Sequence, residues 1–171
     1  MHIGEKYSYN ECAFALGGKI IEHITGETIP DFYKKHLLNP LNLESTVVNG
    51  TGGDANSIPL DMAKISQMLL NKGAYGNKKF FSEETFEKML PLNLSEYIGK
   101  KTPRNYGVGT RWFDNEGFGK GTFGHSAASS ATLRIDPENK LVVVMTRNKG
   151  GSNFEKYHPQ FIKAVLEGLD K

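Results

Sequence analysis

The sequence lacks several features that mark particular classes of protein. Cys12 is the only cysteine among 171 residues, so no disulfide can form within the chain. No apolar stretch approaches the roughly 20 residues that cross a membrane, and residues 1–9 contain no apolar run typical of a signal peptide. The formal net charge is only +2 and no long basic run is present. The sequence therefore favours neither nucleic acid nor a membrane as a partner.

Residues and motifs that could bind a metal or a nucleotide are also scarce. The five histidines form no His-x-x-x-His pair, and one cysteine cannot make a thiolate site, so we expect neither a metal nor a cofactor. Residues 119–124 read GKGTFG and fit G-x-G-x-x-G, but dinucleotide binding needs a strand before this motif and a helix after it. Here it lies between two strand-like segments. We interpret it as a turned link, and a nucleotide-binding protein stays a weaker alternative that calorimetry with ATP and NAD would test.

The composition is that of an ordinary globular protein, with 38% hydrophobic and 23% charged residues. The first part of the sequence predicts helices. Apolar residues recur at helical spacing in four segments. We expect helices over 10–25, from Thr28 to Leu38 with a stop at Asn39-Pro40, from Pro59 to Asn71, and from Ser82 to Pro91. A loop covers 41–53. The Gly17-Gly18 pair indicates close packing of the first helix against a neighbour, and Cys12 in that apolar helix is interpreted as a buried thiol.

After about Tyr97 the pattern changes to strands. Residues 99–105 predict an exposed basic loop, and runs at 106–113, 131–136 and 141–148 predict strands, the last two joined as a hairpin. The run from 141 to 145 is continuously apolar, which is typical of a strand covered on both faces. A final helix is expected over 154–169. The order of helices, antiparallel sheet and closing helix predicts an α+β fold.

Two short segments are candidates for chemistry. Tyr9-Asn10-Glu11 lies directly before a helix, and Gly124-His125-Ser126-Ala127-Ala128 lies at the start of a strand pair. Each is weak alone, because a tyrosine before a helix is usually a packing residue and a lone histidine is usually structural. The sequence between the two segments strengthens both as candidates.

This part of the sequence resembles the serine β-lactamase-like proteins, a group that includes class C β-lactamases, D-alanyl-D-alanine peptidases and related esterases. The phrases YNECAFALGGKIIEHITG, LLNPLNLEST, GTGGDANSIPLDMAKISQMLLNKG, FFSEETFEKML and FGHSAASSATLRIDPENKLVVVMTRN follow one another in the family's order over residues 9–148. The resemblance implies an α+β fold with a helical lobe beside an antiparallel sheet. Residues 1–98 would belong to the lobe and residues 99–171 would form strands and the closing helix, within one incomplete catalytic domain.

The family implies three motifs in one cleft: Ser-x-x-Lys, Tyr-x-Asn, and a Lys-Thr-Gly-type strand. Tyr9 matches the second motif and would act as the general base. Glu11 stands at the asparagine position and would contact substrate, although a carboxylate cannot donate an amide hydrogen bond. An alternative register assigns Asn10 to that role but misaligns the helix that follows.

The third motif is matched by residues 125–127 in a His-x-Gly form. His125 would give the substrate a hydrogen bond or a positive charge, and Ser126 would lie beside it. Ala127 replaces the usual glycine, so its methyl group would crowd a bulky acyl side chain. Ala128 would follow along the edge strand and offer its backbone N–H to an oxyanion.

The first motif is missing, because no serine is followed three residues later by lysine. The resemblance thus implies the C-terminal part of a serine hydrolase of an amide, ester or β-lactam, inactive alone because it lacks a nucleophile. Its partners would be a small acyl substrate and either the missing N-terminal half or a second copy of this chain. A non-catalytic binding or assembly module that keeps the fold is the alternative. The sequence does not separate the substrates or indicate a compartment.

Overall fold

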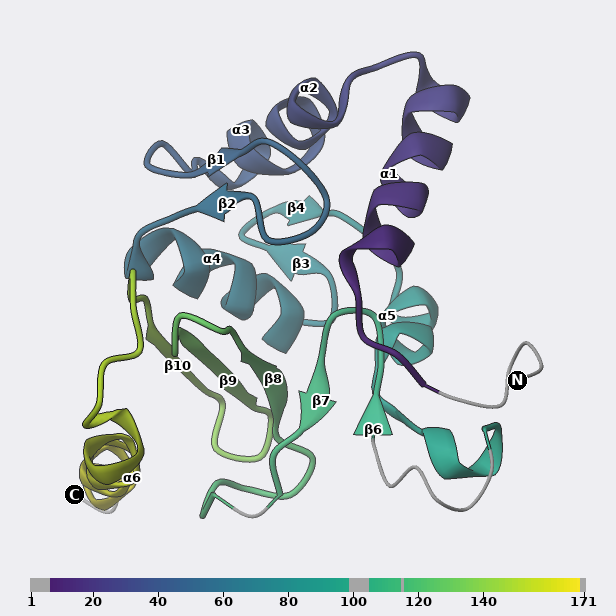
Figure 1. Cartoon of the computed structure of the whole chain (residues 1–171). Coiled ribbons are helices and arrows are strands. Elements are labelled where there is room, and N and C mark those ends of the chain that lie inside the picture. Colours follow the sequence, from purple (N-terminus) through teal and green to yellow (C-terminus); the bar gives the residue numbers. More distant parts are fainter. Residues whose placement is uncertain (1–6, 99–104, 115, 170–171) are drawn as a thin grey trace.

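The computed structural model describes residues 7–98, 105–114 and 116–169, and its fold is α+β (Figure 1). Helices dominate the first half, an antiparallel sheet follows, and a helix closes the chain. The helical elements are α1 (Glu11–Thr25), α2 (Ile29–Tyr33), the π-helical turn η1 (Lys34–Leu38), α3 (Asn39–Leu41), α4 (Pro59–Leu70), α5 (Glu83–Met89), the 3-10 turn η2 (Leu94–Glu96) and α6 (Phe154–Glu167). No helix in the described ranges has the length and apolar character needed to span a membrane.

The main sheet has four antiparallel strands in the order β10-β9-β8-β7. These are β7 (Arg111–Trp112), β8 (Phe123–Ser126), β9 (Thr132–Asp136) and β10 (Leu141–Met145). Three two-stranded pairs lie outside it: β1 (Val47–Val48) with β2 (Ala55–Asn56), β3 (Ala74–Tyr75) with β4 (Lys78–Lys79), and β5 (Leu92–Asn93) with β6 (Asn105–Tyr106). The polar segment predicted as a loop, 99–105, lies outside the described residues except for Asn105.

Side-chain alternation gives the main sheet two different faces. Ile135 and Phe123 are paired across β9 and β8 and pack with Phe86 of α5 in one core cluster. Val143 of β10 packs on the opposite face with Ile162 of α6. Figure 1 shows α4 across the first face and α6 beside the second. The sheet therefore separates a surface that faces the helical lobe from one that faces α6.

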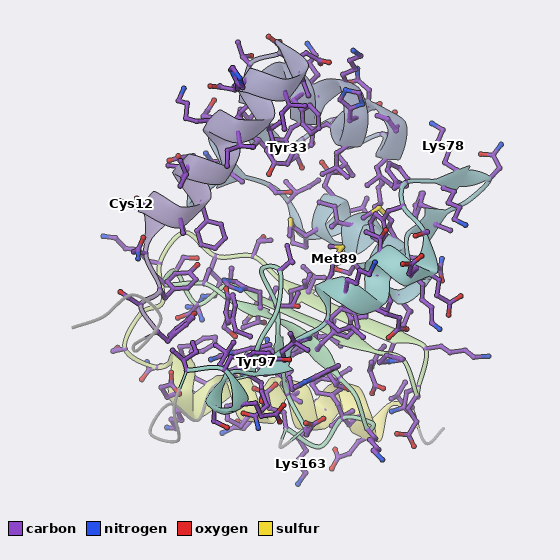
Figure 2. All side chains as sticks on the ribbon, turned by 90° about the vertical axis from the view of Figure 1, so that its right-hand side faces the viewer. Cys12, Tyr33, Lys78, Met89, Tyr97 and Lys163 are labelled. Atoms are coloured by element: carbon purple, nitrogen blue, oxygen red, sulfur yellow. The ribbon has the colours of Figure 1, made fainter. Side chains whose placement is uncertain are left out.

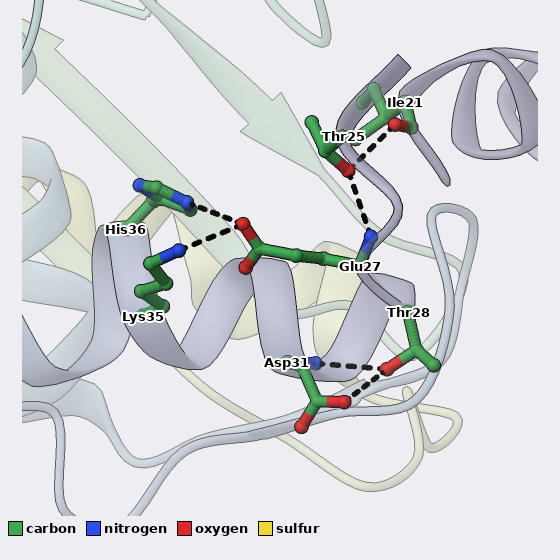
Figure 3. A network of polar contacts seen from close by, with 7 residues as sticks. All are labelled: Ile21, Thr25, Glu27, Thr28, Asp31, Lys35 and His36. Atoms are coloured by element: carbon green, nitrogen blue, oxygen red, sulfur yellow. Dashed lines mark hydrogen bonds and ion pairs between the residues drawn. The ribbon is translucent and has the colours of Figure 1, made fainter. Parts of the chain in front are cut away.

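Local sequence signals account for the junction of α1 and α2 (Figure 3). Gly26 ends α1 in the left-handed conformation with φ 71°, which glycine adopts at little cost. Thr28 then caps α2: its hydroxyl accepts a hydrogen bond from the Asp31 N–H at 3.3 Å and donates one to the Asp31 carboxylate at 2.6 Å. Glu27 pairs with Lys35 at 2.9 Å, which ties the junction to the following turn.

Close packing at the glycine pair is confirmed for one of its members. A Cβ at Gly18 would lie 2.8 Å from Cγ2 of Thr51, whereas nothing lies within 4 Å of a Cβ at Gly17. The Thr51 hydroxyl donates to the Phe14 carbonyl at 2.6 Å. The loop around Thr51 is thus attached to α1 at Gly18, where the absence of a side chain leaves room for it.

Several local predictions were wrong. The helix does not stop at Asn39-Pro40 but continues to Leu41, because the wide π turn before it accommodates the proline within α3. It ends at Asn42, which is left-handed with φ 53°. The strand expected over 106–113 is broken into β6 and β7, which belong to different sheets. Cys12 is exposed on α1 rather than buried (Figure 2).

Candidate active site

Tyr9 lies in the extended segment that leads into α1. Its side chain is 54% exposed, and its ring meets the rings of Phe14 and Tyr106 edge-on at centroid distances of 5.7 and 5.9 Å. Tyr7 lies against Tyr106 as well, at 6.0 Å. We call Tyr7, Tyr9 and Tyr106 the tyrosine cluster. Tyr7 and Tyr9 are near neighbours in the sequence, whereas Tyr106 of β6 joins them only through tertiary packing.

Tyr106 was not identified from the sequence. Its hydroxyl is buried and has no hydrogen-bond partner of normal geometry among the described residues. Burial raises the pKa of Tyr106 to about 12, and the neighbouring Tyr9 and Tyr7 phenols raise it as well. Tyr106 therefore stays neutral at physiological pH beside Tyr9. The only sequence signal was an aromatic residue at the start of a predicted strand, which is usually a packing position.

The two residues after Tyr9 have different structural positions. Asn10 is the N-cap of α1: its carbonyl oxygen accepts from the Ala13 N–H at 3.2 Å, and its amide donates to the Ser8 carbonyl at 3.1 Å. This side chain is thus engaged in capping. Glu11 is the first residue of α1, where a carboxylate suits the helix dipole, and its side chain lies against the backbone of Gly52 and Gly53. A contact of Glu11 with substrate stays a prediction.

His125 is held within β8, opposite Leu133 of β9. Pairing between β7 and β8 ends at Gly124, so His125 and Ser126 extend beyond the last β7 pair. Burial lowers the pKa of His125 below its ordinary value, and the positive charges of Arg111 and Arg134 lower it further, against a hydrogen bond to the Gly109 backbone that raises it. The imidazole is therefore neutral at pH 7.

The residues after His125 form a turn rather than a continuing strand. Ala127 donates its N–H to the Ala131 carbonyl at 2.9 Å, and Ser130 donates to the Ala127 carbonyl at 2.9 Å. Ala128 lies in this turn, so the expectation that it continues along an edge strand was wrong. The reason is that the chain must reverse direction within the five residues 127–131 to pair β8 with β9. Ala127 and Ala128 are both exposed.

One segment contacts both predicted catalytic residues. Residues 106–111 begin at Tyr106, which touches Tyr9, and include Gly109, whose backbone lies close enough to His125 to raise the pKa of the imidazole. The segment is fixed to the end of α5: a Cβ at Gly107 would overlap the Met89 carbonyl, and the Val108 N–H donates to that carbonyl at 3.0 Å. Tyr9 and His125 therefore lie against the same short segment, although 116 positions separate them in the sequence.

Comparison with known proteins identifies the family. The sequence model of the β-lactamase family matches residues 2–167. The chain belongs to the β-lactamase family. A protein of Escherichia coli O157:H7, provisionally named D-alanyl-D-alanine carboxypeptidase, is 25% identical over 205 aligned positions, which cover 85% of this chain and 46% of that protein. The chain thus spans about half the length of the curated relatives it matches.

Solved structures agree with this family at the level of the fold. A β-lactamase from Mycobacterium bovis superposes with a TM-score of 0.75 at 19% identity, covering 97% of this chain and 65% of that one. An octameric penicillin-binding protein homologue from Pyrococcus abyssi gives a TM-score of 0.70 at 23% identity, covering 96% of this chain and 43% of that one. The β-lactamase-like fold predicted from the sequence is confirmed.

The described residues also line open cavities beside the closing helix. Two open cavities of about 660 and 430 Å³ flank α6, and His158 contributes to both, whereas Tyr9 and His125 line neither. Their joint role in one cleft stays a prediction.

Proposed function

We propose that this chain supplies the general base and one substrate-binding edge of a serine hydrolase that acts by acyl transfer on an amide, ester or β-lactam. The observation that carries the proposal is the position of Tyr9 and His125 against the same segment, 106–111, in a member of the β-lactamase family. Contact with one common segment is what we expect of two residues from separate family motifs if both serve the same site.

The roles follow from the surroundings of each side chain. Tyr9 is exposed beside the rings of Phe14 and Tyr106, so its hydroxyl is accessible to take a proton from an attacking serine or water. His125 is neutral at pH 7, so it would offer a hydrogen bond rather than a positive charge to the substrate. A neutral histidine attracts a free carboxylate of the substrate less strongly than a charged lysine at this position would.

The turn after β8 supports an oxyanion contact. The Ala128 N–H donates to no acceptor among the described residues, and it lies exposed three residues beyond His125. A free backbone N–H in this place suits the oxygen of a tetrahedral intermediate. The Ala127 methyl group would narrow the space beside it and favour small acyl groups.

The nucleophile is inferred to come from outside these 171 residues. No serine here has a lysine three positions later, and without a serine–lysine pair an acyl-enzyme cannot form. We expect the isolated chain to give no turnover of a chromogenic β-lactam or a p-nitrophenyl ester above that of a Tyr9→Phe control. Turnover clearly above the control would reveal another nucleophile and overturn this assignment of roles.

Exposed apolar surface supports a partner that covers the chain. Leu16, Ile20 and Ile24 recur every four residues along α1 and are 64%, 52% and 75% exposed. On the other side of the molecule β10 pairs with β9 alone among the described strands, and Tyr157 and Phe161 of α6 are exposed near it. Open strand edges and apolar stripes are sites of association. We infer that the missing N-terminal half, or a second copy of the chain, covers them.

Sedimentation equilibrium over a concentration series tests this inference. We expect a dimer or larger species for the isolated chain, and a 1:1 complex when a polypeptide that carries the family's N-terminal half is added. A monodisperse monomer at high concentration, with cooperative unfolding, would contradict it.

The absent serine–lysine pair equally favours a second function, a binding or assembly module without chemistry. The two proposals differ in one measurement. Addition of the N-terminal half restores turnover in the first case, and Tyr9→Phe abolishes it. In the second case a complex forms but remains inactive with every substrate.

A further inference from the structure

The backbone around His125 is unusually close to the neighbouring strand. Gly124 precedes His125 and is paired with Arg134 of β9. A Cβ at Gly124 would overlap the Leu133 carbonyl oxygen and would lie 3.2 Å from the Cα of Arg134. The Leu133 carbonyl thus occupies the space that a side chain would fill. This gives a physical reason for glycine at the last position of the GKGTFG segment, which nucleotide binding does not explain.

One nitrogen atom of Arg134 joins the two strands at this point. Its Nη1 donates to the His125 carbonyl at 2.9 Å and to the Leu133 carbonyl at 3.0 Å. These two residues are partners in the β8–β9 register. Because hydrogen bonds from a charged donor are about twice as strong as neutral ones, this nitrogen fixes the carbonyl that His125 presents to it.

The guanidinium itself has no freedom to turn. Arg134 is only 2% exposed. Glu116 accepts from its Nε at 2.6 Å and from its Nη2 at 2.9 Å, and the Phe113 ring lies 3.4 Å from its central carbon. Two bonds in a planar fork and a ring face together define the direction of Nη1. Glu116 and Phe113 therefore aim Arg134 at His125.

Arg134 acts from the face of the sheet opposite to the His125 side chain. Successive side chains alternate between faces, and Phe123, which shares a face with His125, packs with Phe86 on the side of the helical lobe. Arg134 is paired with Val143, which packs with Ile162 of α6. Arg134 thus cannot touch a substrate that contacts the imidazole, and any effect on that substrate passes through the backbone.

We propose that Arg134 is a positioning residue for His125: fixed by Glu116 and Phe113, it holds the His125 peptide and thereby the place of the imidazole in the site. The inference rests on the proposed function insofar as His125 meets the substrate. The bonds that carry it belong to this chain alone. The ion pair between the buried Arg134 and the partly exposed Glu116 would then align one strand, in addition to its part in packing.

The pKa of the His125 imidazole reports whether the end of β8 keeps its place. Its surroundings comprise the Gly109 backbone, the Arg111 charge from β7 and the Arg134 charge from β9, in addition to burial, which is the main cause of its lowered pKa. If the His125 carbonyl is released, the strand end moves outward and water reaches the ring. The pKa of His125 then rises toward its ordinary value.

The test uses Arg134→Lys, which keeps the positive charge and loses the fork, and Arg134→Met, which loses both. Arg147→Met is the matched control, because Arg147 lies over Phe154 at 5.4 Å and has no bond to β8. Histidine-labelled chains are titrated by NMR, with the His125 signal assigned from its absence in His125→Gln. We expect a rise of about half a pH unit or more in both Arg134 variants, larger for methionine, and no change in the control.

An Arg134→Lys chain that keeps its circular dichroism spectrum and leaves the His125 titration unchanged would overturn the proposal. Glu116→Gln serves if neither Arg134 variant folds, because it keeps one acceptor and loosens the aim of the guanidinium. A rise in the His125 pKa in that variant supports the proposal, and no rise overturns it. No turnover is measured, so failure here leaves the acyl-transfer proposal standing, and failure of the turnover assay leaves this result valid.

Discussion

The two predicted catalytic residues are held in opposite ways. His125 lies within a paired strand, is partly buried, and has a carbonyl bound by Arg134. Tyr9 precedes a helix, is 54% exposed, and meets the rings of Phe14 and Tyr106 edge-on. The sheet alone thus determines one side of the candidate site, because strand pairing and the ion pair of the buried Arg134 define position. The other side depends on α1, whose outer surface is apolar and uncovered.

The same contrast holds for the regions that carry them. Ile135 in β9 is 0% exposed and belongs to a core cluster, whereas Gly18 is the only buried residue of α1. Regions with few buried apolar contacts open at lower free energy than the core of a sheet. We therefore expect changes in the sheet to destabilise the whole chain and changes on the outer side of α1 to have little effect.

The largest effect is expected for Ile135→Ala. The substitution removes a fully buried side chain from contact with Phe86 and Phe123 and leaves a cavity. The free energy of unfolding, measured by urea titration, should therefore fall by about 2–5 kcal/mol. A loss below about 1 kcal/mol would mean that the sheet core is loosely packed and that the contrast between the two regions is wrong.

The attachment of α1 is tested by the glycine pair. Gly18→Ala should destabilise the chain by about 1–3 kcal/mol, because the methyl group displaces Thr51 from α1. Gly17→Ala has open space and should stabilise it by about 0.5–1 kcal/mol through helix propensity. Thermal unfolding of both variants measures the difference, and equal effects would show that the Thr51 loop does not hold α1.

Alkaline pH probes the tyrosine cluster. The pKa of Tyr106 is raised to about 12 in the folded chain, whereas an unfolded tyrosine ionises near pH 10. Because the folded state retains the proton longer, this contribution to stability is complete below about pH 10 and is lost as the pH rises toward 12. Tyr106→Phe should lack this fall in the free energy of unfolding. Identical alkaline profiles would place Tyr106 in water rather than beside Tyr9.

The smallest effect is expected for Ile20→Ala. Ile20 is 52% exposed on the apolar stripe of α1, so the free energy of unfolding of a monomer should change by no more than about 0.5 kcal/mol. Its effect on association should be larger if a partner covers the stripe. A weaker complex in sedimentation, with unchanged monomer stability, would distinguish a docking surface from a folding surface.

The sequence predicted much of the local structure, because those signals act over a few residues. The Thr28 capping box, the Gly26 stop and the Ser82 cap each form as expected, and the apolar run at 141–145 becomes β10. The end of α3 was missed because a π turn, which has no clear sequence signal, accommodates Pro40. The division of the chain at residue 98 stays a prediction.

The sequence by itself determined the family and the candidate pair of Tyr9 and His125, because both depend on short sequence motifs. It also determined the α+β order of elements, because the periodicity of apolar residues is a local property of the chain. Only the tertiary structure decided what surrounds that pair. Tyr106 joins Tyr9, and Arg134 reaches the His125 carbonyl, across strand pairings and helix contacts that no local pattern encodes. A buried charge such as Arg134 looks like any surface arginine in the sequence. Its burial and its partners arise only when separate strands are brought together.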